Sequence, residues 1–121
     1  MRVREARPGE RETVEGILDA AMLQTGEVEV AIERGDALVA VEDGRLLGAV
    51  ILDPKPGGFH VDAIAVRRRR RGQGIGSVLV EKASQRGDRL TAAFDSDVRP
   101  FYEALGFEIR AKEGRLWGVL E

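Results

Sequence analysis

The sequence predicts an α/β domain whose sheet is mixed but mostly antiparallel, with a central parallel β-α-β unit and flanking helices. Two observations predict this class. Short strand-like stretches joined by tight turns fill the middle of the chain, and later a strand, a helix and another strand follow in close succession. A chain of 121 residues is also the size of a single core. We therefore expect residues 1–121 to form one domain.

The amino-terminal part of the chain carries strand and helix signals in turn. A short strand flanked by Val3 and Ala6 ends at Pro8-Gly9, and an amphipathic helix follows. The apolar face of this helix is formed by Val14, Ile17, Leu18, Ala21 and Met22. The segment from Glu27 to Arg34 alternates like a strand, but Gly35-Asp36 suits a helix exit, and we favour a second helix there.

Antiparallel strands are predicted for the middle of the chain. Ala37–Glu42 and Leu46–Leu52 flank Asp43-Gly44, which suits a type I′ turn because both residue types tolerate positive φ. The next residues, Pro54–Gly58, are expected to form a loop, and Phe59–Val66 the following strand. These strands together form a meander.

The parallel unit is predicted to follow. A helix begins near the glycines at 72–76, and its apolar face is formed by Ile75, Val78, Leu79 and Ala83. Leu90–Phe94 is the next strand, and the intervening helix requires it to lie parallel to Phe59–Val66.

A short helix and a hairpin are expected to complete the domain. The helix covers Val98–Leu105, with Pro100 tolerated in its first turn. Phe107–Ala111 and Leu116–Leu120 then flank Glu113-Gly114 as the two strands of the hairpin.

Composition and charge exclude several classes of function. The chain has no cysteine and one histidine, so we expect no disulfide, no cysteine nucleophile and no metal site. No apolar run is long enough for a membrane span, and Met1–Glu5 lacks the apolar core of a signal peptide, so we expect a cytoplasmic protein. A net charge of −2 argues against nucleic-acid binding, whereas five consecutive arginines, Arg67–Arg71, indicate a local site for phosphates.

The turn from Arg71 to Gly76 is the most informative segment. The start of a helix offers unpaired N–H groups, and glycines let a phosphate approach them, so this turn suits a pyrophosphate. It is not a P-loop, because no Lys-Ser/Thr pair follows the glycines. A plain tight turn and a dinucleotide-binding turn stay open, the latter with Ser77 at its third small position and Asp95 as the ribose acid. The antiparallel meander upstream disfavours the dinucleotide fold.

Two motifs together resemble the GNAT superfamily of N-acetyltransferases. Ile64-Ala65-Val66, the arginines and then Arg71-x-x-Gly74-x-Gly76 resemble the family's acetyl-CoA motif, Gln/Arg-x-x-Gly-x-Gly/Ala. Downstream, the stretch from Pro100 to Phe107 is similar to the family's second motif, a helix ending in Tyr-Glu-x-Leu-Gly-Phe. The resemblance covers most of the chain and implies a GNAT-like domain that uses acetyl-CoA as cosubstrate.

The resemblance also implies where the cosubstrate binds. Backbone amides of the turn would hold the CoA pyrophosphate, namely those of Arg71, Gly72, Gln73, Gly74, Ile75 and Gly76. Backbone groups of Ile64, Ala65 and Val66 would bind the pantetheine arm, in a gap between the strand that ends at Val66 and the strand that ends near Asp95. The remaining arginines are expected to be mainly solvated.

Three residues are candidates for proton transfer and for binding of the acceptor. The resemblance places Tyr102, the only tyrosine, at the position of the family's general acid. His60 is chemically suited to accept a proton from the acceptor amine, and Asp62 to bind a cationic substrate. Alternation predicts His60, Asp62, Ile64 and Val66 on one face of their strand. Arylalkylamine acetyltransferases are similar here, with histidines at the positions of His60 and Asp62.

The sequence thus predicts an acetyltransferase that moves an acetyl group directly to an amine, with no covalent intermediate. A GNAT-like domain that binds acyl-CoA without catalysis is the alternative, and nucleic-acid binding through the arginine block is disfavoured. The acceptor is not identified by the sequence. We expect no membrane or nucleic-acid partner, and a monomer or a homodimer. The acid-rich stretch at 95–97 would favour a positively charged acceptor.

Overall fold

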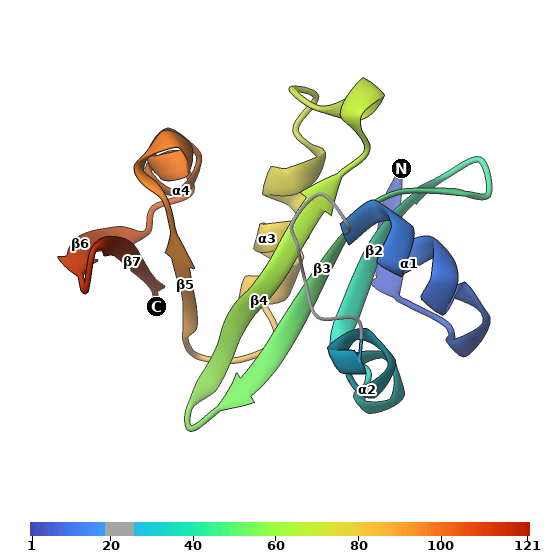
Figure 1. Ribbon diagram of the computed structural model, residues 1–121, viewed down its shortest axis with the longest axis horizontal. Helices are drawn as coiled ribbons and strands as arrows, with labels where there is room; N and C mark the ends of the chain where they lie inside the picture. Colours follow the sequence, from blue (N-terminus) through green and yellow to red (C-terminus); the bar gives the residue numbers. More distant parts are fainter. Residues whose placement is uncertain (19–25) are drawn as a thin grey trace.

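The computed structural model describes residues 1–18 and 26–121, which form one mixed sheet covered by helices on both faces (Figure 1). The seven strands lie in the order β1-β2-β3-β4-β5-β7-β6. The strands are β1 Arg2–Glu5, β2 Ala37–Glu42, β3 Arg45–Lys55, β4 Gly58–Val66, β5 Leu90–Phe94, β6 Glu108–Lys112 and β7 Arg115–Leu120. The helices are α1 Arg11–Leu18, α2 Gly26–Arg34, α3 Ile75–Ser84 and α4 Arg99–Ala104. This confirms the predicted fold class, including the helix at 26–34.

Strands β4 and β5 form the parallel pair that positions the site. Their pairing covers Phe59 with Leu90, His60 with Thr91 and Val61 with Ala92, and then stops. Beyond this point the two strands diverge (Figure 1), and β5 continues in an antiparallel pair with β7. The opening between β4 and β5 therefore lies at the carboxyl ends of two parallel strands. The start of α3 and the side chains of α4 border it.

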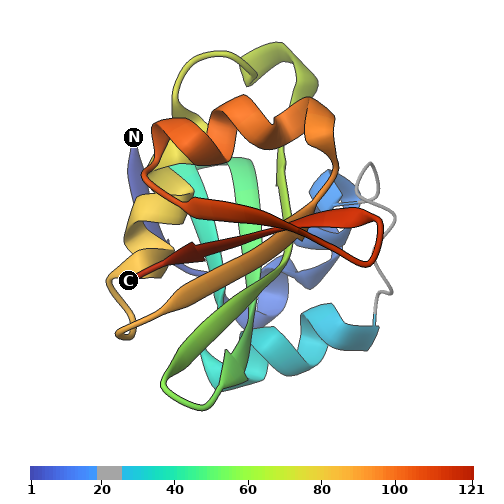
Figure 2. The same cartoon turned by 90° about the vertical axis from the view of Figure 1, so that its left-hand side faces the viewer.

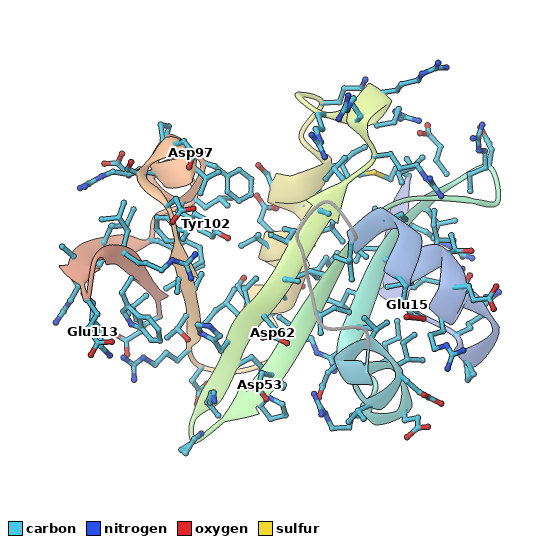
Figure 3. All side chains as sticks on the ribbon, viewed as in Figure 1. Glu15, Asp53, Asp62, Asp97, Tyr102 and Glu113 are labelled. Atoms are coloured by element: carbon cyan, nitrogen blue, oxygen red, sulfur yellow. The ribbon has the colours of Figure 1, made fainter. Side chains whose placement is uncertain are left out.

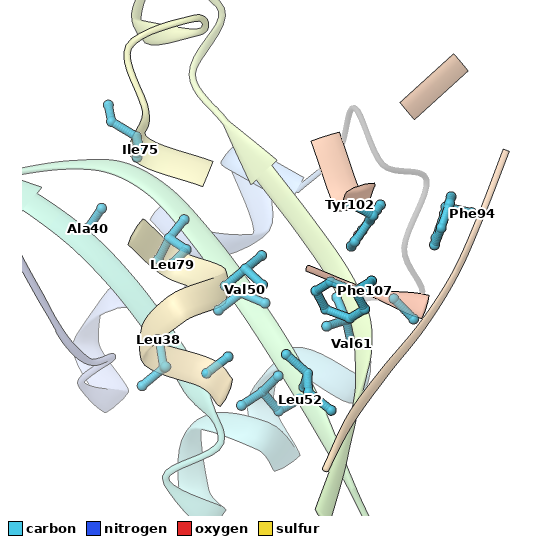
Figure 4. Close-up of a cluster of buried hydrophobic side chains, with 14 of the residues drawn as sticks. Leu38, Ala40, Val50, Leu52, Val61, Ile75, Leu79, Phe94, Tyr102 and Phe107 are labelled. Atoms are coloured by element: carbon cyan, nitrogen blue, oxygen red, sulfur yellow. The ribbon is translucent and has the colours of Figure 1, made fainter. Parts of the chain in front are cut away.

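Buried apolar side chains form two layers, one on each face of the sheet. One cluster lies under α3 and α4 and includes Val50, Leu79 and Tyr102 (Figure 4). The other lies under α1 and α2 and includes Val14, Val28 and Ile51. Full burial of one such aliphatic side chain contributes about 1.5–3 kcal/mol, so both layers stabilise the fold. The sheet is thereby fixed on both sides along β2, β3 and β4.

The two hairpin turns agree with their prediction. Asp43 has φ 51° and Gly44 φ 78°, and Glu113 and Gly114 repeat the pattern with 51° and 79°. Two successive positive φ values define the type I′ turn that matches the twist of the strands. In the view turned by 90°, the second hairpin, β6–β7, lies in front of β5, with α4 above it (Figure 2).

One predicted loop is wrong. The sequence favours a loop over Pro54–Gly58, but β3 continues to Lys55 and β4 begins at Gly58, leaving a turn at Pro56-Gly57. Pro54 is accepted in the strand because it lies beyond Ile51, the last β3 residue paired with β2. Because Pro54 has no N–H, it would remove a ladder hydrogen bond only on an edge that is paired, and at this position the β2 edge of β3 is not.

The apolar residues Ala21 and Met22, predicted for the first helix, lie outside the described residues. None of the helices formed by residues 1–18 and 26–121 has the length and apolarity that crossing a bilayer requires.

Candidate active site

A groove of about 620 Å³ occupies the opening between β4 and β5. Its floor is β4 from Val61 to Val66, and its walls come from the end of β5 and from α4. Tyr102 and Phe101 of α4 line it together with Gly76 at the start of α3. Because β4 pairs with β5 only as far as Val61, the later backbone groups on that edge have no strand partner among residues 1–18 and 26–121. The groove therefore offers an extended ligand both backbone hydrogen bonds and apolar contacts.

A bulge at Asp62 changes which side chains face the groove. Leu52 pairs with Val61 and Ile51 with Ala63, so Asp62 is an extra residue in β4. The alternation of β4 is reversed at this point, because a bulge inserts one residue into the two-residue repeat. The prediction that His60 shares a face with Ile64 and Val66 is therefore wrong.

Burial shows the same change of face along β4. Val61, Ile64 and Val66 belong to the apolar layer under α3 and α4. Ala63 and Ala65 belong to the layer under α1 and α2. His60, one residue before Val61, accordingly projects to the α1 and α2 side of the sheet.

The glycine-rich turn carries unpaired amides beside the groove, which Arg71 and Gly76 of this turn line. Among the described residues, the amides of Gly72, Gln73 and Gly74 donate to no other group. The amides of Ile75 and Gly76 are in the first turn of α3 and have no intrahelical acceptor. Gly74 has φ 83°, and a Cβ placed there would meet no atom within 4 Å. The open space above the turn therefore fits an anionic group.

Several residues of this turn also contribute to the packing of the fold. The Ile75 side chain is buried in the core, so only its backbone faces the opening. Gly76 is needed for packing, because a Cβ there would lie 3.3 Å from the Phe101 ring. Gln73 accepts a hydrogen bond from Arg70 Nε over 2.9 Å.

The five arginines before the turn divide into anchored and solvent-facing side chains. Arg67 Nε donates to Leu46 O at 2.6 Å, and Arg70 Nη2 to Glu42 Oε2 at 2.6 Å, so both hold the loop to the sheet. Arg71 lines the groove, and its Nε donates to Val66 O at 2.9 Å. Arg68 and Arg69 are exposed. Arg71 is thus the arginine of this block that borders the groove.

Tyr102 lies on the α4 side of the groove and is held firmly by aromatic neighbours. Its ring stacks on Phe94 at 4.1 Å between centroids and meets Phe101 and Phe107 edge-on. The residue is 4% exposed, and burial raises the pKa of its hydroxyl. No hydrogen bond to that hydroxyl comes from any described residue. A buried phenol with a raised pKa stays protonated and can act as a proton donor.

His60 lies on β4 at the point where the pairing with β5 is still intact. Its Nδ1 is 2.7 Å from Thr91 Oγ1, and its ring stacks on Trp117 at 5.2 Å with an interplanar angle of 20°. Burial lowers the pKa of the imidazole, and Lys55 adds to the effect, against the opposing influence of Asp62 and Asp53. A lowered pKa keeps the ring neutral near neutral pH, which is the form that accepts a proton.

The acidic residues of the site come from the floor of the groove and from the segment that follows β5. Asp62 is exposed and lies across the opening from Tyr102, near Asp53 of β3 (Figure 3). Asp95 and Asp97 line the groove, and Asp95 Oδ1 is 3.5 Å from Arg115 Nε. The groove is therefore lined by three carboxylates and by the side chains of Arg71 and Arg115.

Thr91 and Trp117 are site residues that the sequence reasoning missed. Each lies on a strand that pairs across the sheet, so its distance from His60 depends on strand order. The register places Thr91 beside His60, and Ala93 beside Trp117. The one available signal was that Trp117 is the only tryptophan of the chain.

A family model described as "Acetyltransferase (GNAT) domain" matches residues 33–109 of the sequence. The matched range contains the glycine-rich turn, Tyr102 and all of the groove lining except Arg115. The chain belongs to this family. Acetyl-CoA is the cosubstrate of GNAT acetyltransferases, and the unpaired amides of the turn and the unpartnered edge of β4 fit its pyrophosphate and its extended arm.

Solved structures share the fold over nearly the whole chain. An aminoglycoside 6′-N-acetyltransferase complexed with coenzyme A superposes with a TM-score of 0.85 at 17% identity, over 99% of this chain and 96% of the other. A Mycobacterium tuberculosis protein in complex with CoA gives 0.86 at 15% identity, over 99% and 98%. An agmatine N-acetyltransferase mutant gives 0.80 at 18% identity, over 98% of each chain. At these identities the comparisons establish the fold. A comparison with curated protein sequences gave no match.

Proposed function

We propose that this protein transfers the acetyl group of acetyl-CoA directly to an amine acceptor, with no covalent enzyme intermediate. The observation that supports this best is the continuous path from the unpaired amides of the glycine-rich turn to Tyr102. An anion at the turn and a thioester near the phenol would occupy the two ends of one groove. Members of the same fold crystallised with CoA add support.

Binding of the cosubstrate is assigned mainly to backbone groups. The amides of Gly72, Gln73, Gly74, Ile75 and Gly76 hold the pyrophosphate, whose charge the start of α3 stabilises. The Arg71 amide, which the sequence places with them, already donates to Arg68 O at 3.3 Å. Ile64, Ala65 and Val66 bind the pantetheine arm through the edge of β4 that lacks a strand partner. The Arg71 side chain borders the groove and adds positive charge to this end.

Tyr102 is assigned as the general acid. Its hydroxyl lacks a hydrogen-bond partner among the described residues, so it is available to the sulfur of the leaving thiolate. The raised pKa keeps the proton on the phenol until the thiolate forms. The stacked Phe94 fixes the direction of the ring.

His60 is assigned as the base that accepts the proton of the acceptor amine, directly or through water. With Nδ1–H donating to Thr91 Oγ1, Nε2 keeps the lone pair that takes up the proton. Asp62, which lines the groove at the bulge of β4, attracts the acceptor as its ammonium form. The amine loses its proton before it attacks the thioester carbonyl.

A thermal melt with and without acetyl-CoA tests the cosubstrate assignment. At 100 times Kd the ligand should stabilise the protein by about 2.7 kcal/mol, which raises Tm by several degrees in a domain of this size. Gly74→Glu should abolish the increase, because a carboxylate side chain would fill the anion site and the residue requires φ 83°. Gly16→Glu is the matched control, since Gly16 lies exposed in α1 with no atom near its Cβ position.

The outcome separates three explanations. An increase of Tm that Gly74→Glu removes and Gly16→Glu preserves supports the site, and turnover with a panel of amines then distinguishes an enzyme from a domain that only binds acyl-CoA. No increase at saturating acetyl-CoA contradicts the proposed function. NAD is then the next ligand to test, because the turn also fits a dinucleotide.

A further inference from the structure

A second pocket, of about 440 Å³, lies at the paired end of β4 and β5 beside His60. Lys55, Arg89 and Trp117 contribute to its lining. Lys55 of β3 alternates in step with Asp53, which pairs with His60, so it lies on the same sheet face as His60. Arg89 directly precedes β5 and lines the same pocket. We call this the basic pocket.

Two positive charges border the basic pocket with little compensation. Arg89 is exposed and forms no ion pair with any described residue. Lys55 Nζ contacts Asp53 Oδ2 at 3.1 Å, but both side chains are about half exposed, so water can replace this contact at small cost. The His60 imidazole and the Trp117 ring also line the pocket. An anionic group would find two donors there.

The basic pocket and the groove are neighbours along β4 and β5. On β4, His60 lines the pocket and Val61 lines the groove. On β5, Thr91 lines the pocket and Ala93 lines the groove. Asp62, the residue assigned to the acceptor's ammonium, follows His60 by two residues and Phe59 by three. Along a strand these separations correspond to roughly 7 Å and roughly 10 Å.

We propose that the basic pocket binds an anionic group of the acceptor, so that the acceptor is an amine with a carboxylate or phosphate at the far end of its molecule. The inference rests on the proposed function, because it uses the groove as the place of the reacting amine. Asp62 attracts the amine end, and Arg89 and Lys55 bind the anionic end by charge-assisted hydrogen bonds. The acceptor then lies along β4 and passes His60 on the way.

Trp117 fluorescence tests the proposal, because it is the only tryptophan and lines the pocket. The probes are 6-aminohexanoate, 6-aminohexyl phosphate and hexylamine, titrated with CoA present. We expect at least one anionic probe to bind about tenfold more tightly than hexylamine, since one charge-assisted contact at a partly exposed site has this value. The two anionic probes show whether carboxylate or phosphate is preferred.

Variants identify the groups responsible. Arg89→Gln should remove most of the advantage of the anionic probes and leave hexylamine unchanged. Lys82→Gln is the matched control, because Lys82 is an exposed cation on α3, on the other side of the sheet. If Arg89→Gln lowers Tm, Lys55→Gln carries the same test.

The result can overturn the proposal without affecting the proposed function. Equal binding of all three probes, tighter binding of hexylamine, or no fluorescence response to any probe contradicts the basic pocket as an anion site. The increase of Tm with acetyl-CoA is measured on the same sample. If that increase is present while the probes fail, only the acceptor class is wrong, and if it is absent, the proposed function itself is contradicted.

Discussion

The two ends of the contact between β4 and β5 are built in different ways. At the diverging end the groove uses backbone amides of a turn and an unpartnered strand edge. At the paired end the basic pocket uses side chains, among them Lys55, His60 and Trp117, from three strands. The first end suits a ligand that every member of a family shares. The second end depends on residues that can change while the fold is kept.

This difference indicates how one domain combines a fixed cosubstrate with a particular acceptor. A backbone site requires only that glycines and a helix start occur in the correct order. A side-chain site requires a defined register between strands, and here the register places His60 beside Thr91. The bulge at Asp62 separates the two ends, because it turns the side chains before and after it to opposite faces.

Tyr102→Phe is expected to have the largest effect and acts at the diverging end. Removing a general acid should lower kcat by about 10²-fold or more, because the thiolate then leaves without its proton. The stacking on Phe94 does not need the hydroxyl, so Tm and its increase with acetyl-CoA should stay close to those of the wild type. Steady-state kinetics with an accepted amine and parallel melts are the measurements. Unchanged kcat would exclude Tyr102 from the chemistry.

Gly58→Ala is expected to have the next largest effect and acts at the paired end. A Cβ at Gly58 would lie 2.0 Å from Arg89 O, where β4 and β5 meet. We expect a loss of about 2–3 kcal/mol in the free energy of unfolding, since overpacking against backbone forces the strands apart. Urea denaturation measures it. At the neighbouring Gly57, φ is 80° and a Cβ would meet no atom within 4 Å. Gly57→Ala should therefore lower the free energy of unfolding by only about 1 kcal/mol, because alanine is strained at positive φ. Equal losses in the two variants would show that the close contact is unimportant.

The smallest expected effect is the pH dependence of stability that comes from His60. Burial lowers the pKa of the folded imidazole, so the folded state binds fewer protons than the unfolded state. The free energy of unfolding should therefore fall as pH is lowered from about 6.5 through the depressed pKa, and this slope should be absent in His60→Gln. Denaturation at several pH values and NMR titration of the single histidine measure it. A histidine that titrates at or above its usual pKa would contradict the neutral base.

Local signals in the sequence were sufficient for most of the elements. Type I′ turns at Asp43-Gly44 and Glu113-Gly114 depend on two adjacent residues, and both occur as predicted. Helix α2 was favoured over a strand because Gly35-Asp36 suits a helix exit, and Gly35 has the positive φ, 81°, that is common just after a helix. By contrast the continuation of β3 through Pro54 was missed, because proline is acceptable there only on account of the strand edge it occupies.

For the candidate site, the sequence by itself determined the glycine-rich turn, Tyr102 and the membership of the family, because these depend on residues close together in the chain. Only the tertiary structure decided that β4 carries a bulge, that His60 faces away from Ile64, and that Thr91 and Trp117 enclose its ring. The physical reason is that strand register and face depend on pairing between distant segments. One inserted residue reverses the alternation, and no local pattern records it.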